Sequence, residues 1–294
     1  MKHQIEWPGG AACAALITVN FNAERTIVAS NPEYADLEKT LSTSAYGVKH
    51  GVDNLLQAFE QAGVKTSWFV PGIVAAAHGE LIQKVAEEHE VGTSGWDFEP
   101  LAGLDRASIA DRLSRTIETF NGLGITPRGF RLPRGEWQQG LVEEMLAAGI
   151  EWSSSWEADD LPFLLPGVDG TLVELPFRWV LEDRQAFIWN YSPAMPPGHS
   201  RIASYADVLE SWLEELRGTH AEGGLWTLTV NPDIIGTPGR IGLLVKVLEE
   251  LRSLPDVWIP TGSELADWWR SNGPANSQYH PVEVFLRETE WTSL

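Results

Sequence analysis

Cysteine and basic residues are scarce in this sequence, and each shortage excludes a class of protein. The 294 residues include one cysteine, so neither an internal disulfide framework nor a cluster of thiolate metal ligands is available. There are 21 lysines and arginines against 41 aspartates and glutamates, a formal net charge of −20. Phosphate backbones and anionic lipids attract lysine and arginine, so we expect no nucleic-acid partner and no membrane partner.

Long apolar runs are also missing. No stretch approaches the roughly 20 apolar residues that a membrane-spanning helix needs. Residues 1–10 have neither the basic segment nor the apolar segment of an export signal, so we expect a cytoplasmic protein. The single cysteine, Cys13, lies in an alanine-rich run, which predicts a small buried side chain.

The apolar residues that are present alternate between short β-branched or aromatic runs and segments with helical spacing. This alternation is typical of βαβ units around a parallel sheet, which either closes into a barrel or stays open as a doubly wound sheet. About eight runs resemble strands, the number that a closed barrel needs. They are residues 15–21, 66–70, 90–95, 129–133, 150–155, 172–179, 225–230 and 257–260.

The chain shows no obvious division. No linker rich in proline, glycine or serine separates two parts, and no internal repeat is visible. We therefore expect a single domain over residues 1–294, with a core of about 15–270 and a C-terminal extension at 271–294. Two long insertions, residues 23–46 and 189–204, lie where barrel enzymes place loops that cover the substrate.

Polar residues gather where the predicted strands end. The carboxyl ends of parallel barrel strands meet at one mouth, which is where barrel enzymes carry their reactive groups. We therefore expect Asn20, Asn22, Ser94, Arg131 and Asn231 to converge at this mouth.

Motifs in the same segments resemble the polysaccharide deacetylase family, also known as the NodB-homology family or carbohydrate esterase family four. The likeness runs in order from about Ala15 to about Trp269. It implies an α/β fold, a deformed (β/α) barrel of seven to eight strands. The matching motifs are Asn20-Phe21-Asn22-Ala23-Glu24, Tyr46-Gly47-x-x-x-Gly51-Val52, Trp68-Phe69-Val70-Pro71-Gly72, the segment from His89 to Glu99, Gly129-Phe130-Arg131-x-Pro133, Ser154-Ser155 with Asp159-Asp160-Leu161-Pro162-Phe163, Glu174-Leu175-Pro176 with Trp179, and Thr229-Val230-Asn231-Pro232.

The residues that bind metal in that family are replaced here. After its first strand the family reads Asp-x-Asp-x-Glu, with the first aspartate as general base and the second as metal ligand, and these positions hold Asn20 and Asn22. The resemblance implies that the two histidine ligands would fall at Ser94 and Phe98, and a second catalytic histidine at Asn231. A zinc-type ion needs three good donors, so we expect no metal and no other cofactor.

One branch of the superfamily, the metal-independent allantoinase-like hydrolases of cyclic amides, resembles this chain in part. Its members also carry asparagine at the position of Asn20, with an acidic or amide residue nearby. They keep a histidine at the position of Ser94, and there this chain departs from the branch.

An asparagine at position 20 cannot serve as a charged proton acceptor, so a base would have to lie elsewhere. Carboxylates near the strand ends are candidates, and burial beside Trp96 or Trp137 would let one of them exchange protons near neutral pH. The alternative for each is a structural role in bracing a loop or capping a turn. These carboxylates are Glu24, Asp97, Glu99, Glu136, Asp159 and Asp160.

The remaining polar residues allow two interpretations each. Arg131 would either pair with one of these acids or clamp a substrate carboxylate. The asparagines and Ser94 would form either a hydrogen-bonding cage for an amide or imide, with asparagine as an oxyanion donor, or a polar plug left after metal loss. Our candidate catalytic residues are Asn20, Asn22, Glu24, Ser94, Arg131 and Asn231, and our candidate substrate-binding residues are Trp96, Asp97, Phe98, Glu136, Trp137, Asp160 and Trp179.

The hypothesis for function is a metal-independent hydrolase, or a lyase of related chemistry, acting on a non-peptide carbon–nitrogen or acyl bond. The 14 tryptophans favour a small cyclic or aromatic substrate in an aromatic-walled pocket, although core packing explains most of them. The alternatives are a catalytically inactive barrel that binds a small ligand or partner, and a metal-dependent deacetylase with substituted ligands. The family resemblance also implies a homo-oligomer.

The replaced ligands generate a prediction about metal. Protein purified without chelator should hold far less than one equivalent of zinc, cobalt or nickel, measured by elemental analysis, because the site lacks anionic and imidazole donors. Any activity should survive chelation. The variant Phe98→His should not bind metal tightly either, because one histidine supplies one of at least three donors. A stoichiometric metal at Asn22 and Ser94, with activity lost on chelation, would contradict the interpretation.

Overall fold

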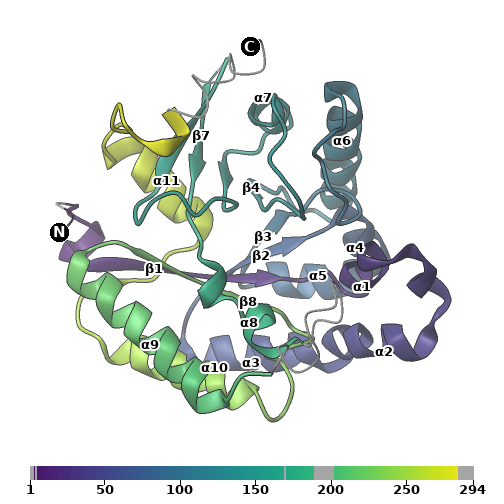
Figure 1. Ribbon diagram of the computed structural model, residues 1–294, viewed down its shortest axis with the longest axis horizontal. Coiled ribbons are helices and arrows are strands. Elements are labelled where there is room, and N and C mark those ends of the chain that lie inside the picture. The colour runs from purple at the N-terminus through teal and green to yellow at the C-terminus, as the bar shows by residue number, and fades with distance from the viewer. Residues whose placement is uncertain (1–2, 4, 169, 189–201, 284–294) are drawn as a thin grey trace, which may run out of the picture.

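The computed structural model describes residues 3, 5–168, 170–188 and 202–283, and its core is a curled mixed sheet surrounded by helices (Figure 1). The strands are β1 (Cys13–Asn20), β2 (Ser67–Val70), β3 (Glu90–Thr93), β4 (Gly129–Phe130), β5 (Trp152–Ser153), β6 (Phe163–Gly167), β7 (Gly170–Glu174), β8 (Leu225–Val230) and β9 (Val257–Trp258). The helices are α1 (Arg25–Ser30), α2 (Glu38–Tyr46), α3 (Val52–Ala62), α4 (Gly72–Ala77), α5 (Gly79–Ala86), α6 (Arg106–Gly122), α7 (Leu141–Ala147), α8 (Asp183–Phe187), α9 (Tyr205–Glu222), α10 (Ile241–Ser253) and α11 (Gly262–Asn272). Shorter turns are η1 (Pro8–Gly10), η2 (Pro32–Asp36), η3 (Gly47–Gly51) and η4 (Trp179–Leu181).

The strand order is β6-β7-β5-β4-β3-β2-β1-β8, with β9 paired to the start of β1. All neighbours run parallel except β6 and β7, which form an antiparallel hairpin at one edge. A single parallel bridge between Glu182 and Thr229 joins the chain that follows β7 to β8 at the other edge. The sheet therefore curls into the deformed (β/α) barrel that the sequence predicts.

Successive side chains of β1 point alternately to the outer and to the inner face of the sheet. Ala15, Ile17 and Val19 belong to the core beneath the surrounding helices, together with Trp226 and Leu228 of β8. Ala14 and Leu16 instead pack with aromatic residues in a separate inner cluster. Because the period of a strand is two residues, Thr18 and Asn20 continue the inner face toward the end of β1.

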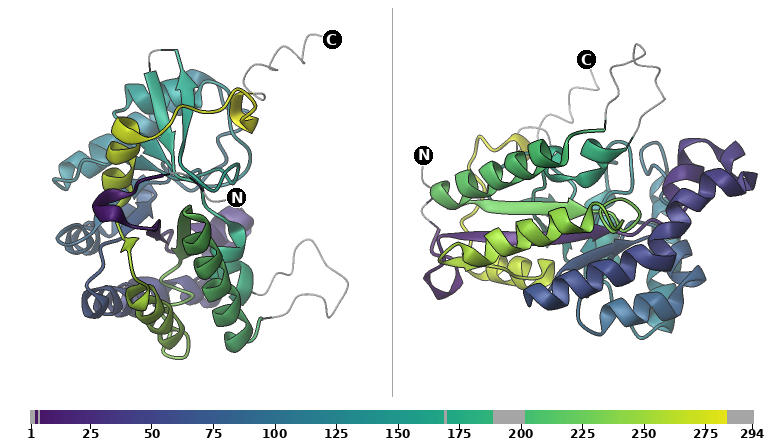
Figure 2. Two further views of the ribbon diagram at one scale, coloured as in Figure 1. Left: turned by 90° about the vertical axis from the view of Figure 1, so that its left-hand side faces the viewer. Right: turned by 90° about the horizontal axis from the view of Figure 1, so that it is seen from below.

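Helices cover the outer face, and the views along and below β1 show their arrangement (Figure 2). α3, α10 and α9 lie side by side against the outer faces of β1 and β8. α3 is amphipathic and buries Val52, Leu55 and Phe59. It ends at Gly63, whose φ of 64° is the left-handed conformation that suits a helix C-terminus.

One end of the barrel is closed by aromatic packing. Trp7 lies within 6.1 Å of Trp258, Trp268 and Trp269, measured between ring centroids. Gly262 at the start of α11 contacts Trp152 so closely that a Cβ there would lie 2.2 Å from its ring. This end is at the beginning of the parallel strands, which leaves the other end for the mouth.

Several sequence expectations need correction. The hairpin strand β6 was not predicted, and the predicted strands at 129–133 and 150–155 are reduced to two residues each. The insertion at 23–46 is not a simple loop but folds as α1, η2 and α2. Residues 189–201 of the second insertion and 284–294 of the C-terminal extension lie outside the described residues. Cys13 is fully buried, as predicted, and burial raises the pKa of its thiol to about 12.

None of the helices in the described part of the chain is long and apolar enough to cross a membrane.

The glycines of the Tyr46–Val52 motif press a helix against the end of β8. α2, η3 and α3 form one continuous helix in which η3 is a single π-helical turn. A Cβ on Gly51 would lie 2.1 Å from the carbonyl oxygen of Pro232, and a Cβ on Gly47 would lie 3.0 Å from the backbone nitrogen of Asp233. The motif therefore fixes the position of the loop that follows Asn231.

This contact generates a stability prediction. Gly51→Ala should lower the free energy of unfolding by roughly 3 kcal/mol, because its methyl group collides with backbone atoms that cannot rotate away. Gly218→Ala is the matched control: Gly218 lies in α9, and a methyl group there would meet no heavy atom within 4 Å outside its own helix backbone, so this variant should gain up to about 1 kcal/mol. Urea unfolding of both variants checks the prediction, and a Gly51→Ala variant as stable as the wild type would contradict it.

Candidate active site

A layer of hydroxyl groups and one guanidinium lies inside the barrel below the mouth. Arg131, the residue that follows β4, donates to Thr229 Oγ1 at 3.1 Å, to Thr18 Oγ1 at 3.3 Å and to Ser154 Oγ at 2.7 Å. Thr18 and Thr229 also share a hydrogen bond of 2.9 Å. Four strands thus contribute to one polar layer.

Arg131 does not behave as the sequence suggested. Its side chain is enclosed, with 5% of the residue exposed, and its hydrogen-bond partners among the described residues are hydroxyls rather than carboxylates. Its guanidinium carbon lies 4.5 Å from the ring centroid of Phe69 and 4.9 Å from that of Phe177. Burial lowers the pKa of Arg131 to about 10, against the opposing attraction of Glu182 and Glu174. Arg131 is therefore a buried cation below the mouth and not a surface clamp.

The next layer up forms the floor of the mouth. Asn20 and Asn231, which are two residues beyond Thr18 and Thr229, both point their amide groups at one carboxylate. Asn20 Nδ2 lies 3.4 Å and Asn231 Nδ2 lies 3.3 Å from Glu182 Oε1. The structure therefore brings the two predicted asparagines together through a residue that the sequence analysis did not single out.

Asp183 fixes Asn231 and the turn behind it. Its Oδ1 accepts from Asn231 Nδ2 at 2.6 Å, and its Oδ2 accepts from the backbone nitrogens of Asn231 at 2.9 Å and Ile235 at 3.1 Å. Arg184 donates to Asn231 Oδ1 at 3.2 Å. Burial raises the pKa of Asp183 to about 8, with Glu182 adding to the rise and the hydrogen bonds from Asn231 opposing it.

Two amide oxygens at the mouth are buried without a donor. Asn20 Oδ1 and Asn22 Oδ1 have no hydrogen-bond partner within the described residues, and Asn22 is 6% exposed. A buried carbonyl oxygen normally finds a donor, because leaving it unpaired costs about 1–3 kcal/mol. Both oxygens are therefore unpaired acceptors beside the end of β1.

Ion pairs hold the loops around the mouth. Arg25, just beyond β1, binds Asp97 in a two-pronged contact with N–O distances of 2.5 and 2.8 Å. Glu99 Oε2 accepts from the Asp97 backbone nitrogen at 2.6 Å, and its Oε1 lies 3.1 Å from Arg112 Nε. Asp97 and Glu99 thus brace loops, the alternative that the sequence analysis allowed.

The metal positions of the family do not fit a divalent ion in this chain. Ser94 is buried directly after β3, and Phe98 has a φ of 55°, which is rare for a residue other than glycine. An amide, a hydroxyl and a phenyl ring supply neither anionic charge nor imidazole nitrogen. Within the described ranges, no three His, Cys, Asp or Glu side chains are grouped so that they could hold a metal ion.

Other predicted site residues lie apart from this cluster. Trp96 faces away from the mouth, because its ring packs against Gly72 and lies 3.7 Å from the Arg115 guanidinium carbon. Asp160 is at the wrong end of the barrel: its carbonyl accepts from the Leu225 backbone nitrogen at the start of β8, and its carboxylate pairs with Arg178.

The remaining candidates are peripheral. Glu24 precedes α1, and no side-chain hydrogen bond from it caps that helix. Glu136 is exposed, and its neighbour Trp137 packs edge-on against Trp156 at 5.4 Å. Trp179 is 61% exposed in η4. Trp68, Trp152 and Trp226 are enclosed in hydrophobic cores, so packing accounts for them.

A third buried carboxylate, Glu174, ends β7. Its Oε1 accepts from the backbone nitrogens of Ser155 and Trp156. Burial raises the pKa of Glu174 to about 7, while these hydrogen bonds and the charge of Arg131 oppose the rise. The signal that could have pointed to Glu174 is an acid at the end of an apolar strand, whereas Glu182 and Asp183 follow the η4 turn and carry no such signal.

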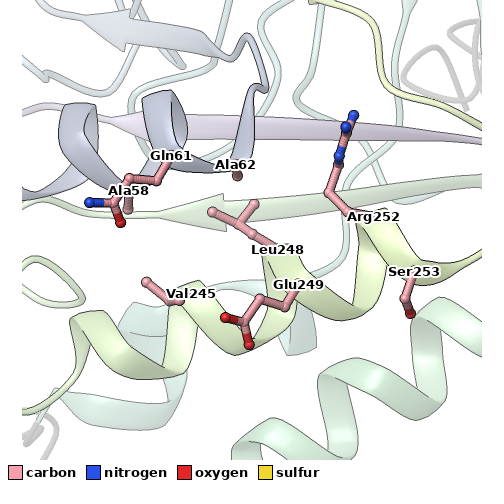
Figure 3. A pocket seen from close by; sticks show the side chains of 8 residues that line it. All are labelled: Ala58, Gln61, Ala62, Val245, Leu248, Glu249, Arg252 and Ser253. Atoms are coloured by element: carbon pink, nitrogen blue, oxygen red, sulfur yellow. The ribbon is translucent and has the colours of Figure 1, made fainter.

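A groove on the outer surface carries no comparable grouping. It lies between α3 and α10, has a volume of about 500 Å³, and is lined largely by aliphatic groups such as Ala58, Val245 and Leu248 (Figure 3). Its polar residues, among them Glu249 and Arg252, spread along two helices rather than converge. The polar cluster at the mouth is therefore the better candidate site.

Comparison with known proteins agrees with this geometry. Residues 41–153 match the polysaccharide deacetylase family. A crystal structure from Mycobacterium smegmatis, assigned as a polysaccharide deacetylase, is 31% identical, with 94% of this chain and 97% of that chain covered and a TM-score of 0.87. A peptidoglycan deacetylase of Helicobacter pylori is 22% identical over 81% of this chain and 90% of its own length. The structure of PuuE allantoinase shares the fold at 20% identity, 92% and 94% coverage and a TM-score of 0.77.

The chain therefore belongs to the polysaccharide deacetylase family. It is a divergent member of this family of deacetylase-type hydrolases, and the positions at which the motif resemblance implies metal ligands hold Asn22, Ser94 and Phe98.

The buried Glu174 generates a pH prediction. Burial raises the pKa of Glu174 in the folded state. Between about pH 4.5 and 7 the unfolded chain has therefore released this proton while the folded chain keeps it. The contribution of Glu174 to the free energy of unfolding thus falls as the pH rises. In Glu174→Gln this contribution disappears, and the slope of unfolding free energy against pH should become more positive than that of the wild type by up to about 1.4 kcal/mol per pH unit.

Glu157→Gln, on an exposed residue of the same region, is the control and should keep the wild-type slope. Denaturant unfolding at several pH values measures both variants. Equal slopes in the wild type and Glu174→Gln would show that Glu174 is ionised in the folded protein throughout this range.

Proposed function

We propose that this protein is a metal-independent hydrolase, or a lyase of related chemistry, that cleaves a non-peptide carbon–nitrogen or acyl bond in a small cyclic or aromatic molecule. The observation that carries the proposal is the pair of buried, donor-free amide oxygens of Asn20 and Asn22. They stand where the family resemblance places the general base and a metal ligand.

The mouth favours a ligand that donates hydrogen bonds. The Nδ2 groups of Asn20 and Asn231 are both directed at Glu182, so they are engaged within the protein. The acceptors that remain are amide oxygens and a carboxylate, which pair with N–H or O–H groups. Cyclic amides, imides and ureides present such N–H groups beside the carbon–nitrogen bond that would be cleaved.

The donor set also supports a reaction without a metal. Asn22, Ser94 and Phe98 do not fit a zinc-type ion, so activation of water has to come from a protein group. The name of PuuE allantoinase, a relative by fold, indicates a hydrolase of a small ring compound, whereas the name of the Helicobacter pylori relative indicates a polymer substrate. The enclosed floor of the mouth agrees better with the former.

The second candidate is a barrel that binds a small ligand without turnover. The observation in its favour is the replacement of the family's base and ligand positions by Asn20, Asn22, Ser94 and Phe98. Both functions require ligand binding at the same mouth, and only the first requires product.

A turnover screen distinguishes them. Wild-type protein treated with chelator is incubated with cyclic imides, ureides and acylated aromatic amides, and product is followed by mass spectrometry. At least one class should be hydrolysed, and Asn22→Ala should lower kcat/KM for it about tenfold through loss of one buried hydrogen bond.

Asn121→Ala, on an exposed residue of α6, is the matched control and should keep wild-type kcat/KM. Calorimetric binding of a ring compound without product would favour the non-catalytic barrel. Activity that appears only when metal is added back would contradict the metal-independent proposal.

A further inference from the structure

We infer that Glu182 is the general base of this site and that it takes over the role that Asn20 cannot perform. The inference rests on the proposed hydrolytic function and assigns a catalytic residue to it. It is carried by the position of Glu182, by its exposure and by the way its oxygens are held.

Glu182 is positioned by the barrel itself. Its backbone forms the parallel bridge to Thr229, two residues before Asn231, so it sits at the level of the mouth. The backbone nitrogen of Glu182 donates to the Trp179 carbonyl at 3.0 Å, which ends η4 directly before it. The carboxylate is therefore set on a fixed backbone and not on a free loop.

Its side chain lies between the two positions at which the family resemblance places catalytic groups. Asn20 and Asn231 stand at the places of the aspartate base and of the second histidine, and each points Nδ2 at the same oxygen, Glu182 Oε1. These two donors to Oε1 fix the orientation of the carboxylate. The other oxygen, Oε2, then faces Gln185 and accepts from its Nε2 at 3.4 Å. Neutral amides thus hold a single acid where relatives use several charged groups.

Three buried carboxylates surround the floor of the mouth, and Glu182 alone among them is partly exposed and held only by long hydrogen bonds. Asp183 and Glu174 are fully enclosed, whereas Glu182 is 9% exposed. Asp183 accepts three hydrogen bonds of 2.6 to 3.1 Å, and Glu174 Oε1 is bound to the backbone of Ser155 and Trp156. The hydrogen bonds to Glu182 are longer, at 3.3 to 3.4 Å, so a water molecule can compete for its oxygens.

The chemistry that follows is a balanced hydrolysis. Glu182 takes a proton from water while the water oxygen forms a bond to the amide carbon and the carbonyl electron pair moves onto its oxygen. The tetrahedral intermediate then re-forms the carbonyl and breaks the carbon–nitrogen bond. The electron pair leaves with nitrogen, and Glu182 returns its proton to that nitrogen. One water is consumed, the ring opens to one molecule that carries a new carboxylic acid and a new N–H bond, and the Glu182 carboxylate is regenerated.

The decisive variant is Glu182→Gln, which keeps the size of the side chain and an oxygen that can accept from Asn20 and Asn231. With the ring substrate identified in the turnover screen, kcat should fall at least about 100-fold, the lower range for loss of a general base, while KM changes less than about threefold. Glu182→Asp should recover part of kcat, because it restores a carboxylate at a shorter reach. Glu33→Gln, on an exposed residue of η2, should keep the wild-type values.

The outcomes separate the two proposals. An active wild type with an inactive but folded Glu182→Gln variant supports both, folding being checked by circular dichroism and urea unfolding. An active wild type whose Glu182→Gln variant keeps more than about a third of kcat overturns the role of Glu182 and leaves the hydrolase intact. A wild type that turns over none of the ring compounds overturns the hydrolase proposal, and the role of Glu182 with it.

Discussion

The charged guanidinium of Arg131, buried inside the barrel, constrains the charge of the residues that lie above it at the mouth. Arg131 is almost fully enclosed, and its direct partners Thr18, Thr229 and Ser154 are neutral. An isolated buried ion costs several kcal/mol, so its charge has to be balanced by carboxylates in the surrounding low-dielectric interior. Glu174 and Glu182 supply that balance, since both attract the Arg131 charge. The charge of Arg131 in turn opposes the rise in the pKa of Glu174, so the cation and this acid favour each other's charged form.

The same constraint explains how the family's base could be lost without loss of the fold. An aspartate at position 20 would lie two residues beyond Thr18 in β1, and its negative charge would itself balance the positive charge of Arg131. With Asn20 in its place, the negative charge of this layer rests on Glu182, to which Asn20 now donates. The acid above Arg131 in this chain thus comes from the segment that follows β7.

What the sequence predicted depends on where the predicted strands end. The carboxyl ends of parallel strands meet at one mouth, so Asn20 at the end of β1 and Asn231 directly after β8 could be placed there from the chain alone. Glu182 could not, because it follows a short 3-10 turn and meets β8 through one bridge. Asp160 was misplaced for a related reason: its motif pairs with the start of β8, a contact that strand ends do not reveal. The hairpin strand β6 was missed because Pro166 and Gly167 look like a turn.

The balance of donors and acceptors finally limits what the mouth can hold. Glu182 and the oxygens of Asn20 and Asn22 are acceptors, the Nδ2 groups of Asn20 and Asn231 are engaged internally, and Arg131 lies a layer below. A ligand carboxylate placed against Glu182 would meet a carboxylate and two carbonyl oxygens, and the nearby cation, Arg184, already donates to Asn231 Oδ1 at 3.2 Å. A neutral ring bearing N–H groups satisfies the same three acceptors without adding charge to a site that already holds buried acids. In the proposed function, this site would therefore recognise its ligand by accepting hydrogen bonds from it and not by binding an ion at Asn22, Ser94 and Phe98.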